Sequence, residues 1–238
     1  MSKWQKFWDS YRNDHALSEA DLFIQVGKTV ARQPISRVMF QHMVQRIVDS
    51  LQLGQNDHVL DLCCGNGLIS FELAAVAKQV TGVDFARHLI SGAQAFKSRS
   101  NISYRVADVT LPLSELVGET DGLPDKLLMN DALAYFEPGT LAVIVDNVCD
   151  ALDGRAFRFL LTGIPSSALK WNFYDTPERK RRYQENLQAG DSTNDGLGRW
   201  WTTDEIEALA ISRGLSVRVE DQPEGISNYR MDALIWRD

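Results

Sequence analysis

The chain has 238 residues, of which 44% are hydrophobic and 24% charged, and this composition suits one substantial globular domain with a buried core. The formal net charge of −7 argues against nucleic acid as a partner, because phosphate binding needs a surplus of Lys and Arg on one face. Three cysteines, two of them adjacent, make a poor disulfide framework and indicate a reducing compartment.

The amino-terminal residues lack the apolar stretch of a signal peptide, and no window reaches the roughly 20 apolar residues of a spanning helix. We therefore expect a cytoplasmic protein with no membrane partner and no metal centre. Aromatic residues at helical spacing predict a helix at the start of the chain. They are Trp4, Phe7, Trp8 and Tyr11. A second helix is expected from Ile35 to about Leu53, with Pro34 near its start and Gly54 just beyond its end.

From residue 58 onward, short apolar segments alternate with helical patterns. The predicted strands cover residues 58–62, 79–84, 102–106, 126–130 and 157–161. The predicted helices cover residues 67–77, 88–97 and 139–152. Strands and helices that alternate at this spacing indicate βαβ units and a mostly parallel sheet.

The alternation ends after the fifth strand. Residues 163–201 are polar, aromatic and irregular, and they are followed by a helix from Thr203, its expected N-cap, to Arg213. Two closing strands, 215–219 and 231–236, are expected to form a hairpin. We therefore predict effectively one domain, with an N-terminal helical cap over residues 1–54, a main domain over 55–238 and an insertion over 163–202.

The strongest local motif is the turn after the first of these strands. Gly65 and Gly67 lie in a run of small residues between strand and helix, where the absence of a Cβ lets backbone approach a ligand. Asp84 follows Gly65 by 19 positions, which is where an acid that binds a ribose belongs. This pattern fits a dinucleotide site as well as an adenosyl site.

Two further acids favour the adenosyl alternative. Asp61 lies inside the first of these strands, and a carboxylate there suits an ammonium and a sulfonium but not a pyrophosphate. Asp108 ends the third strand, where it can accept a hydrogen bond from an adenine amino group. The closing hairpin, in place of another βαβ unit, also separates the chain from nicotinamide-dependent enzymes.

With these residues, the chain resembles the class I S-adenosylmethionine-dependent methyltransferases from about residue 55 to its end. The resemblance implies an α/β, Rossmann-like fold with a seven-stranded, mostly parallel sheet and helices on both faces. The implied strand order is 3-2-1-4-5-7-6, with strand 7 antiparallel. The family usually has Gly where this chain has Cys63.

The resemblance also implies S-adenosylmethionine as the cofactor and a set of residues around it. Asp61, Cys63 and Gly65 would contact the methionine part, in the turn that Gly67 completes. Asp84 would hold the ribose, with Phe85 against the adenine. Asp108 and Val109 would contact the adenine edge, and Asn130 would lie beside the methyl donor. The aromatic stripe that includes Tyr11 either caps the cofactor, packs on the sheet or forms a dimer contact.

A general base is less clearly marked. Among the histidines, His15 is the candidate base, with a structural role as the alternative. His58 begins a strand at the end of the sheet away from the expected ligand site, and His88 lies beside Asp84, the predicted ribose-binding acid. Asp131 either contacts the substrate or is a helix cap or solvated loop acid. Tyr135 either orients an acceptor or simply packs.

The insertion is predicted to fold over the acceptor side as a lid, with a partner surface or plain packing as the alternatives. Its basic run, residues 179–182, either binds a substrate phosphate or carboxylate or is a solvated helix face. Residues 25–29 superficially resemble a nucleotide-phosphate loop, but Leu22 stands where that loop requires Gly.

We therefore predict methyl transfer from S-adenosylmethionine, which becomes S-adenosylhomocysteine, to a small polar molecule such as a sugar or nucleotide-sugar. A homodimer is left open. The alternatives are a non-catalytic protein that binds the same cofactor and an NAD(P)-dependent oxidoreductase, because a fold of this kind does not by itself determine function.

Overall fold

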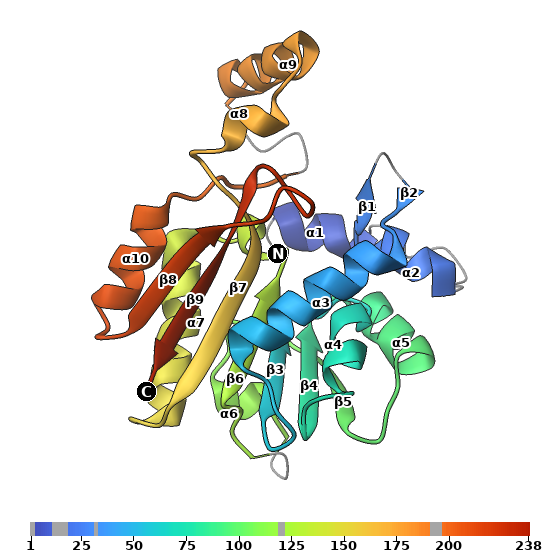
Figure 1. Cartoon of the computed structure of the whole chain (residues 1–238), viewed down its shortest axis with the longest axis vertical. Helices are drawn as coiled ribbons and strands as arrows, with labels where there is room; N and C mark the ends of the chain where they lie inside the picture. The colour runs from blue at the N-terminus through green and yellow to red at the C-terminus, as the bar shows by residue number, and fades with distance from the viewer. Residues whose placement is uncertain (1–2, 11–18, 31–32, 119–121, 191–196) are drawn as a thin grey trace.

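The computed structural model describes residues 3–10, 19–30, 33–118, 122–190 and 197–238. Its main sheet has seven strands in the order β5-β4-β3-β6-β7-β9-β8 (Figure 1). The strands are β3 (His58–Leu62), β4 (Gln79–Asp84), β5 (Ile102–Val106), β6 (Lys126–Asn130), β7 (Phe157–Pro165), β8 (Ser216–Asp221) and β9 (Arg230–Arg237). Numbered along the chain, these strands follow the predicted order 3-2-1-4-5-7-6, and β9 is antiparallel to both its neighbours. The predicted α/β fold is confirmed.

Two apolar cores cover the two faces of this sheet. One core joins the sheet to α3 (Arg37–Leu51) and α4 (Leu68–Leu73), and the other joins it to α6 (Leu113–Leu116), α7 (Pro138–Leu152) and α10 (Thr203–Ile211). Every residue of β3 is buried, as expected for a central parallel strand covered on both sides. The helix α5 (Arg87–Phe96) packs against the β4 and β5 edge.

Several element boundaries differ from the predicted ones, and two of the differences follow from side-chain caps. α3 begins two residues later than predicted because the Ser36 side chain accepts a hydrogen bond from the Met39 backbone amide. α4 ends at Leu73, four residues early, and β7 continues four residues beyond the predicted end. Thr202, and not Thr203, caps α10, because Thr202 and Glu205 form a reciprocal capping box.

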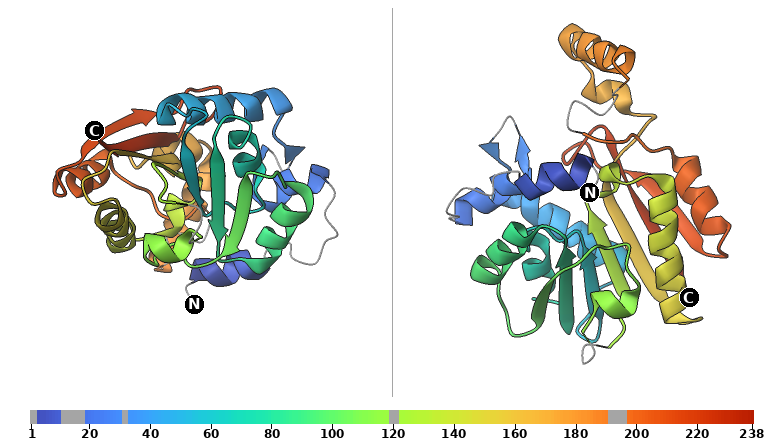
Figure 2. Two further views of the ribbon diagram at one scale, coloured as in Figure 1. Left: turned by 90° about the horizontal axis from the view of Figure 1, so that it is seen from below. Right: turned by 180° about the vertical axis from the view of Figure 1, so that it is seen from behind.

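The N-terminal region contains elements that the sequence did not predict. Besides the predicted α1 (Lys3–Ser10), the chain forms α2 (Glu19–Gln25) and a small hairpin of β1 (Thr29–Val30) and β2 (Gln33–Pro34). Figure 1 and the view from behind in Figure 2 place α1 near the ends of the central strands. This region therefore lies where ligands bind in open α/β sheets.

The insertion forms an arm. It contains α8 (Lys170–Phe173) and α9 (Pro177–Gln188). These helices project beyond the sheet in Figure 1 and in the right-hand view of Figure 2. Within the described part of the chain, no helix is long and apolar enough to cross a membrane. All three cysteines are free thiols.

Candidate functional site

A pocket of about 360 Å³ lies at the carboxyl ends of β3, β4 and β6, within the size range of small-molecule sites. Its lining includes nine of the residues singled out from the sequence. These are Cys63, Gly65, Asp84, Phe85, Asp108, Val109, Asn130, Asp131 and Tyr135. Residues far apart in the chain therefore meet at one place, although their roles stay predictions.

Two of the predicted cofactor residues lie behind the pocket wall. Asp61 is 1% exposed and accepts a hydrogen bond of 2.6 Å from the Ser70 hydroxyl. Burial raises the pKa of Asp61 to about 7, although the Ser70 hydrogen bond acts in the opposite direction. Gly67 makes room for the ring of Tyr104, which a Cβ at that position would overlap. Neither residue lines the pocket, so any effect on a ligand acts through the turn or through charge.

The turn itself is strained at the position where the family has glycine. Cys63 adopts a left-handed backbone with φ of 60°, and Gly65 does so with φ of 56°. A side chain in this region costs about 1–2 kcal/mol relative to glycine. Burial, followed by the charges of Asp84 and Asp61, raises the pKa of Cys63 well above its usual range, so this thiol stays neutral.

Asp84 and Asp108 present carboxylates to the same pocket from neighbouring strand ends. Asp84 accepts hydrogen bonds from the Gly65 amide at 3.0 Å and the Ala86 amide at 2.9 Å, which fix its orientation. Burial raises the pKa of Asp84 above its ordinary value. Asp108 is exposed, and its Oδ1 accepts from the amide and hydroxyl of Thr110.

Aromatic residues of α1 cover the pocket. The ring of Tyr135 lies 4.8 Å from that of Trp4 and 5.6 Å from that of Trp8, and all three residues line the cavity. Of the alternatives for the aromatic stripe, this arrangement favours a cap over the ligand site. Tyr11 and His15, predicted as a cofactor contact and a base, lie outside the described residues. No histidine is among the described residues that line the pocket.

The loop after α2 forms a wall of the pocket that the sequence did not reveal. The Asn66 amide donates to the Leu22 carbonyl at 2.8 Å and to Gln25 at 2.9 Å, which ties this loop to the glycine turn. Val26 lies against Gly65, and a Cβ added at Gly65 would lie 3.0 Å from the Val26 Cγ1 atom. Lys28 is 7% exposed and also lines the pocket. The rejected phosphate-loop pattern thus contains a pocket residue.

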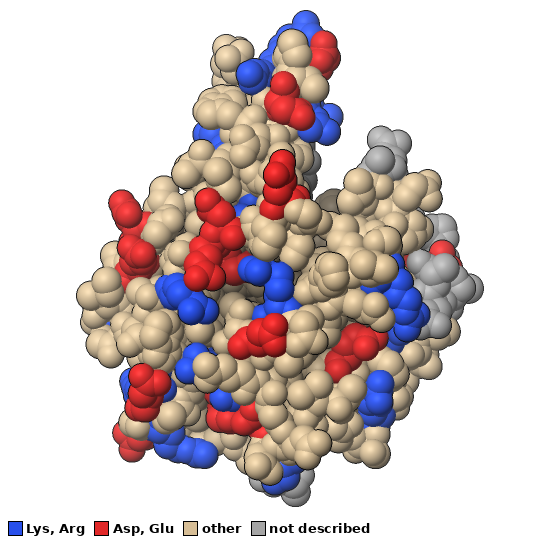
Figure 3. Space-filling model, in the orientation of Figure 1, with Lys and Arg blue, Asp and Glu red and all other residues tan. Residues whose placement is uncertain are grey.

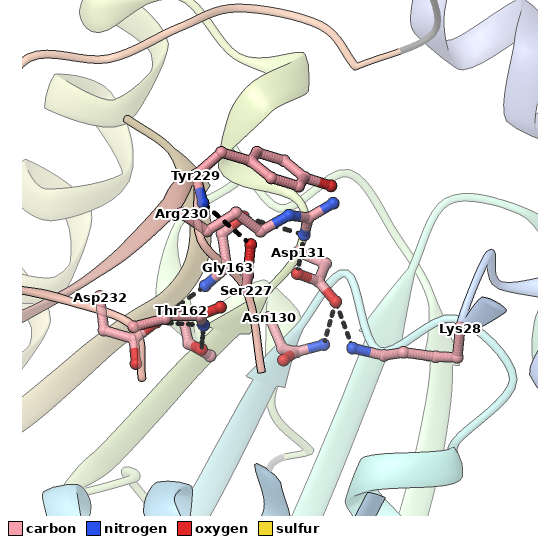
Figure 4. Close-up of polar contacts among 10 residues, drawn as sticks. Lys28, Asn130, Asp131, Thr162, Gly163, Ser227, Tyr229, Arg230 and Asp232 are labelled. Atoms are coloured by element: carbon pink, nitrogen blue, oxygen red, sulfur yellow. Dashed lines mark hydrogen bonds and ion pairs between the residues drawn. The ribbon is translucent and has the colours of Figure 1, made fainter. Parts of the chain in front are cut away.

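Lys28 forms an ion-pair cluster with Asp131 and Arg230, which we call the 28–131–230 cluster. Figure 4 shows Lys28 and Arg230 approaching the Asp131 carboxylate, and each cation pairs with a different oxygen. Burial opposes ionisation of Asp131, but the two cations prevail and hold its pKa below the usual range. Such a carboxylate is a weak general base, so the geometry favours a positioning role for Asp131.

The backbone beneath this cluster is shaped to admit it. Asp131 has a left-handed φ of 55°, and Gly163, with φ of 74°, lies directly against it. A Cβ at Gly163 would overlap the Asp131 carboxylate. The pairing of β7 with β9 is irregular here, and Arg230 also donates to the Gly163 carbonyl at 3.1 Å. Bulges and left-handed residues of this kind gather at functional sites.

The arm does not reach the pocket. No described residue from 163 to 202 is among those that line the cavity. Its aromatic rings pack on one another, with Tyr174 4.5 Å from Tyr183 and 5.7 Å from Trp200. A lid role therefore stays a prediction, and it would need the arm to move.

The charges around the pocket suit a cationic ligand. Among the described lining residues, the acids are Asp84, Asp108, Asp131 and Glu137, and the cation is Lys28. This excess of carboxylates is favourable for a sulfonium and an ammonium and unfavourable for a pyrophosphate. Among the described residues, no group of three or more His, Cys, Asp or Glu could hold a metal ion.

Comparison with known proteins gives the same picture of the fold. The family described as "Methyltransferase domain" matches residues 59–153. Magnesium protoporphyrin IX methyltransferase from Synechocystis, solved with bound SAM, is 16% identical with a TM-score of 0.56, covering 100% of this chain and 92% of that one. An N-methyltransferase from Bradyrhizobium japonicum is 17% identical with a TM-score of 0.57, covering 85% of this chain and 98% of that one.

Curated relatives match a shorter part of the chain. Proteins named 23S rRNA (uracil(1939)-C(5))-methyltransferase from Haemophilus parainfluenzae and Aliivibrio fischeri are 37% identical over 78 residues and 33% identical over 115 residues. These matches cover 32% and 47% of this chain. The chain spans 18% and 24% of the length of these relatives.

These names overturn the expectation that nucleic acid is an unlikely partner. Net charge is a sum over the whole chain and does not describe a local surface. Acidic and basic side chains are interspersed over the face in Figure 3, and residues 179–182 of the basic run are all exposed on α9. A charge of −7 was therefore insufficient ground for that expectation.

Proposed function

We propose that the chain is a class I S-adenosylmethionine-dependent methyltransferase, that its pocket binds this cofactor and that the methyl group passes to a polar acceptor beside Asn130 and Asp131. The observation that carries the proposal is the excess of carboxylates in a pocket at the carboxyl ends of β3, β4 and β6. Three free thiols agree with a cytoplasmic location.

The pocket residues fit the parts of the cofactor. Asp84, held by two backbone amides, would accept hydrogen bonds from the ribose hydroxyls. Phe85, Asp108 and Val109 would surround the adenine, and Gly65 would lie along the methionine part. When bound, the cofactor supplies a methyl group made electrophilic by its sulfonium. The Asp61 carboxyl, behind the wall, would favour the cationic part through charge.

The residues of this chain would mainly align the reactants and exclude water. Trp4, Trp8 and Tyr135 close one side of the pocket with apolar surface. Alignment of this kind contributes on the order of 7–11 kcal/mol in well-oriented reactions. We assign Asp131 to positioning of the acceptor and Tyr135 to its orientation, with His15 kept as the candidate base.

For the acceptor we propose a small polar molecule such as a sugar or nucleotide-sugar, since the pocket is enclosed by aromatic residues from α1 and is lined by polar groups on its Asp131 side. The second candidate is a nucleotide within RNA, which the names of the curated relatives favour. Both candidates use the same cofactor pocket.

A transfer experiment tests the proposal. Purified chain would be incubated with cofactor labelled in its methyl group, together with nucleotide-sugars and sugars in one set of reactions and ribosomal RNA in another. Label in a small product supports the first acceptor class, and label in RNA supports the second. Cofactor binding without transfer to any acceptor would favour a non-catalytic binding protein.

A further inference from the structure

The 28–131–230 cluster carries more positive than negative charge. Among the described residues, Asp131 is the acid that forms ion pairs with Lys28 and Arg230, so two cations share one carboxylate. Asp61, which also interacts with Lys28 through charge, is partly protonated at neutral pH because burial raises its pKa to about 7. A cluster with surplus positive charge thus lies at the edge of a pocket that is otherwise acidic.

The cluster is accessible and keeps unused donors. The side chains of Arg230 and Asp131 are 24% and 25% exposed, and Lys28 lines the pocket. An ammonium has three N–H donors and a guanidinium has five, which exceeds what one carboxylate and the Gly163 carbonyl accept. Both cations therefore keep N–H donors for a second oxyanion.

The geometry is maintained by structure outside the pocket. Gly163 donates its amide to Asp232 Oδ1 at 2.9 Å, and the same oxygen accepts from the Gln222 side-chain amide at 2.7 Å. The Arg230 guanidinium lies over the ring of Tyr229, 5.3 Å from the ring centroid. The cations are thus held in place before any ligand arrives, which lowers the entropy cost of binding.

We propose that the 28–131–230 cluster binds a phosphodiester group of the methyl acceptor, through Lys28 and Arg230. A phosphodiester has a single negative charge and brings the cluster to neutrality, and its oxygens match the arginine fork. A phosphorus atom with one ionised oxygen occurs in the backbone of RNA and, twice, in the pyrophosphate of a nucleotide-sugar. The inference rests on the proposed function, because it specifies the acceptor of that site.

The test measures binding and needs no turnover. Dimethyl phosphate, a bare phosphodiester, would be titrated into the full chain saturated with S-adenosylhomocysteine and followed by phosphorus NMR. We expect saturable binding that weakens at least about tenfold in Lys28→Gln and in Arg230→Met, as for the loss of a charge-assisted hydrogen bond. Arg230→Lys should recover part of the affinity, and it keeps a cation beside Asp131 should Arg230→Met fail to fold.

Arg46→Met is the matched control. It removes an arginine that pairs with the other oxygen of Asp232, whereas Arg230 pairs with Asp131. This variant should bind dimethyl phosphate as the wild type does. Affinity for S-adenosylhomocysteine should stay within about twofold in Arg230→Met, because the cluster is assigned to the acceptor.

Competition identifies the source of the phosphodiester. Displacement of the probe by uridine diphosphate glucose indicates a nucleotide-sugar, and displacement by a short single-stranded RNA indicates RNA. No saturable binding to the wild type, or equal binding to Arg230→Met, overturns the proposal. A parallel loss of S-adenosylhomocysteine binding in Arg230→Met also overturns it, since the cluster would then serve the cofactor. Failure of methyl transfer with intact probe binding would instead affect the proposed function.

Discussion

The two sides of the pocket are built in different ways. The cofactor side comes from consecutive strand ends, with Cys63, Gly65, Asp84 and Asp108 within one stretch of about 45 residues. The acceptor side combines two lining residues, Lys28 and Asp131, with Gly163 and Arg230, which contact Asp131 without lining the pocket. These four residues lie up to 202 positions apart. A site made from one contiguous stretch leaves a readable motif, whereas a site assembled from distant segments does not.

The largest expected effect is the pH dependence of stability that comes from Asp61, the buried acid behind the cofactor side of the pocket. Because the folded-state pKa of Asp61 is raised to about 7, the folded chain holds one more proton than the unfolded chain between about pH 4 and pH 7. The stabilisation is fully present below about pH 4 and is lost as pH rises through 7, by about 4 kcal/mol.

Urea unfolding of the wild type and of Asp61→Asn across this pH range measures the effect. The Asn variant keeps an acceptor for Ser70 and should lack this part of the pH dependence. Equal slopes for the two proteins would show that Asp61 is ionised in the folded chain at all these pH values.

The second effect tests the acceptor side. Gly163→Ala should lower the free energy of unfolding by about 3 kcal/mol, because the added Cβ overlaps the Asp131 carboxylate and breaks its half-buried ion pair with Arg230. It should also abolish methyl transfer while leaving cofactor affinity nearly unchanged. Gly214→Ala is the control, with φ of 66° and no heavy atom within 4 Å of its Cβ. It should cost only about 1 kcal/mol, from backbone strain. Similar losses in both variants would contradict the assigned contact.

The third effect separates the two sides through ligand affinity. Asp84→Asn should weaken S-adenosylhomocysteine binding about 30-fold, or about 2 kcal/mol, because it removes a charged acceptor from the proposed ribose site. Calorimetric titration measures this, and Arg230→Met provides the comparison from the acceptor side. If Arg230→Met weakens S-adenosylhomocysteine binding more than Asp84→Asn does, the assignment of Asp84 to the cofactor and of Arg230 to the acceptor is wrong.

The smallest effect concerns the strained turn. Cys63→Gly should raise the free energy of unfolding by about 0.5 kcal/mol, because relief of the left-handed backbone slightly exceeds the added entropy of the unfolded chain. Cys64→Gly should instead lower it by about 1–2 kcal/mol, since Cys64 is buried and has no positive φ. Thermal unfolding of the two variants should therefore shift in opposite directions.

The central fold could be predicted because its signals are local. The bounds of β3, β4, β5 and β6 agree with the sequence pattern, since each is a short apolar run between clear turn residues. α2 and the β1–β2 hairpin could not be predicted in the same way. Their positions depend on contacts with the glycine turn, such as the Asn66 hydrogen bonds to Leu22 and Gln25.

The same distinction holds for the candidate site. The approach of Asp84 and Asp108 follows from parallel strands that end at one edge. Asp131 could be located from the sequence, but its two cations could not, because Lys28 precedes the main sheet and Arg230 begins β9, far along the chain from β6. The placement of Asp61 behind the wall depends on Ser70, a partner that no spacing rule identifies.

Calorimetric titration of the purified full chain with S-adenosylmethionine tests the central claim most directly. The account predicts saturable binding at one site per chain and no binding of nicotinamide adenine dinucleotide, whose pyrophosphate would meet the carboxylates of Asp84 and Asp108. Binding of the dinucleotide with no binding of S-adenosylmethionine would contradict the account.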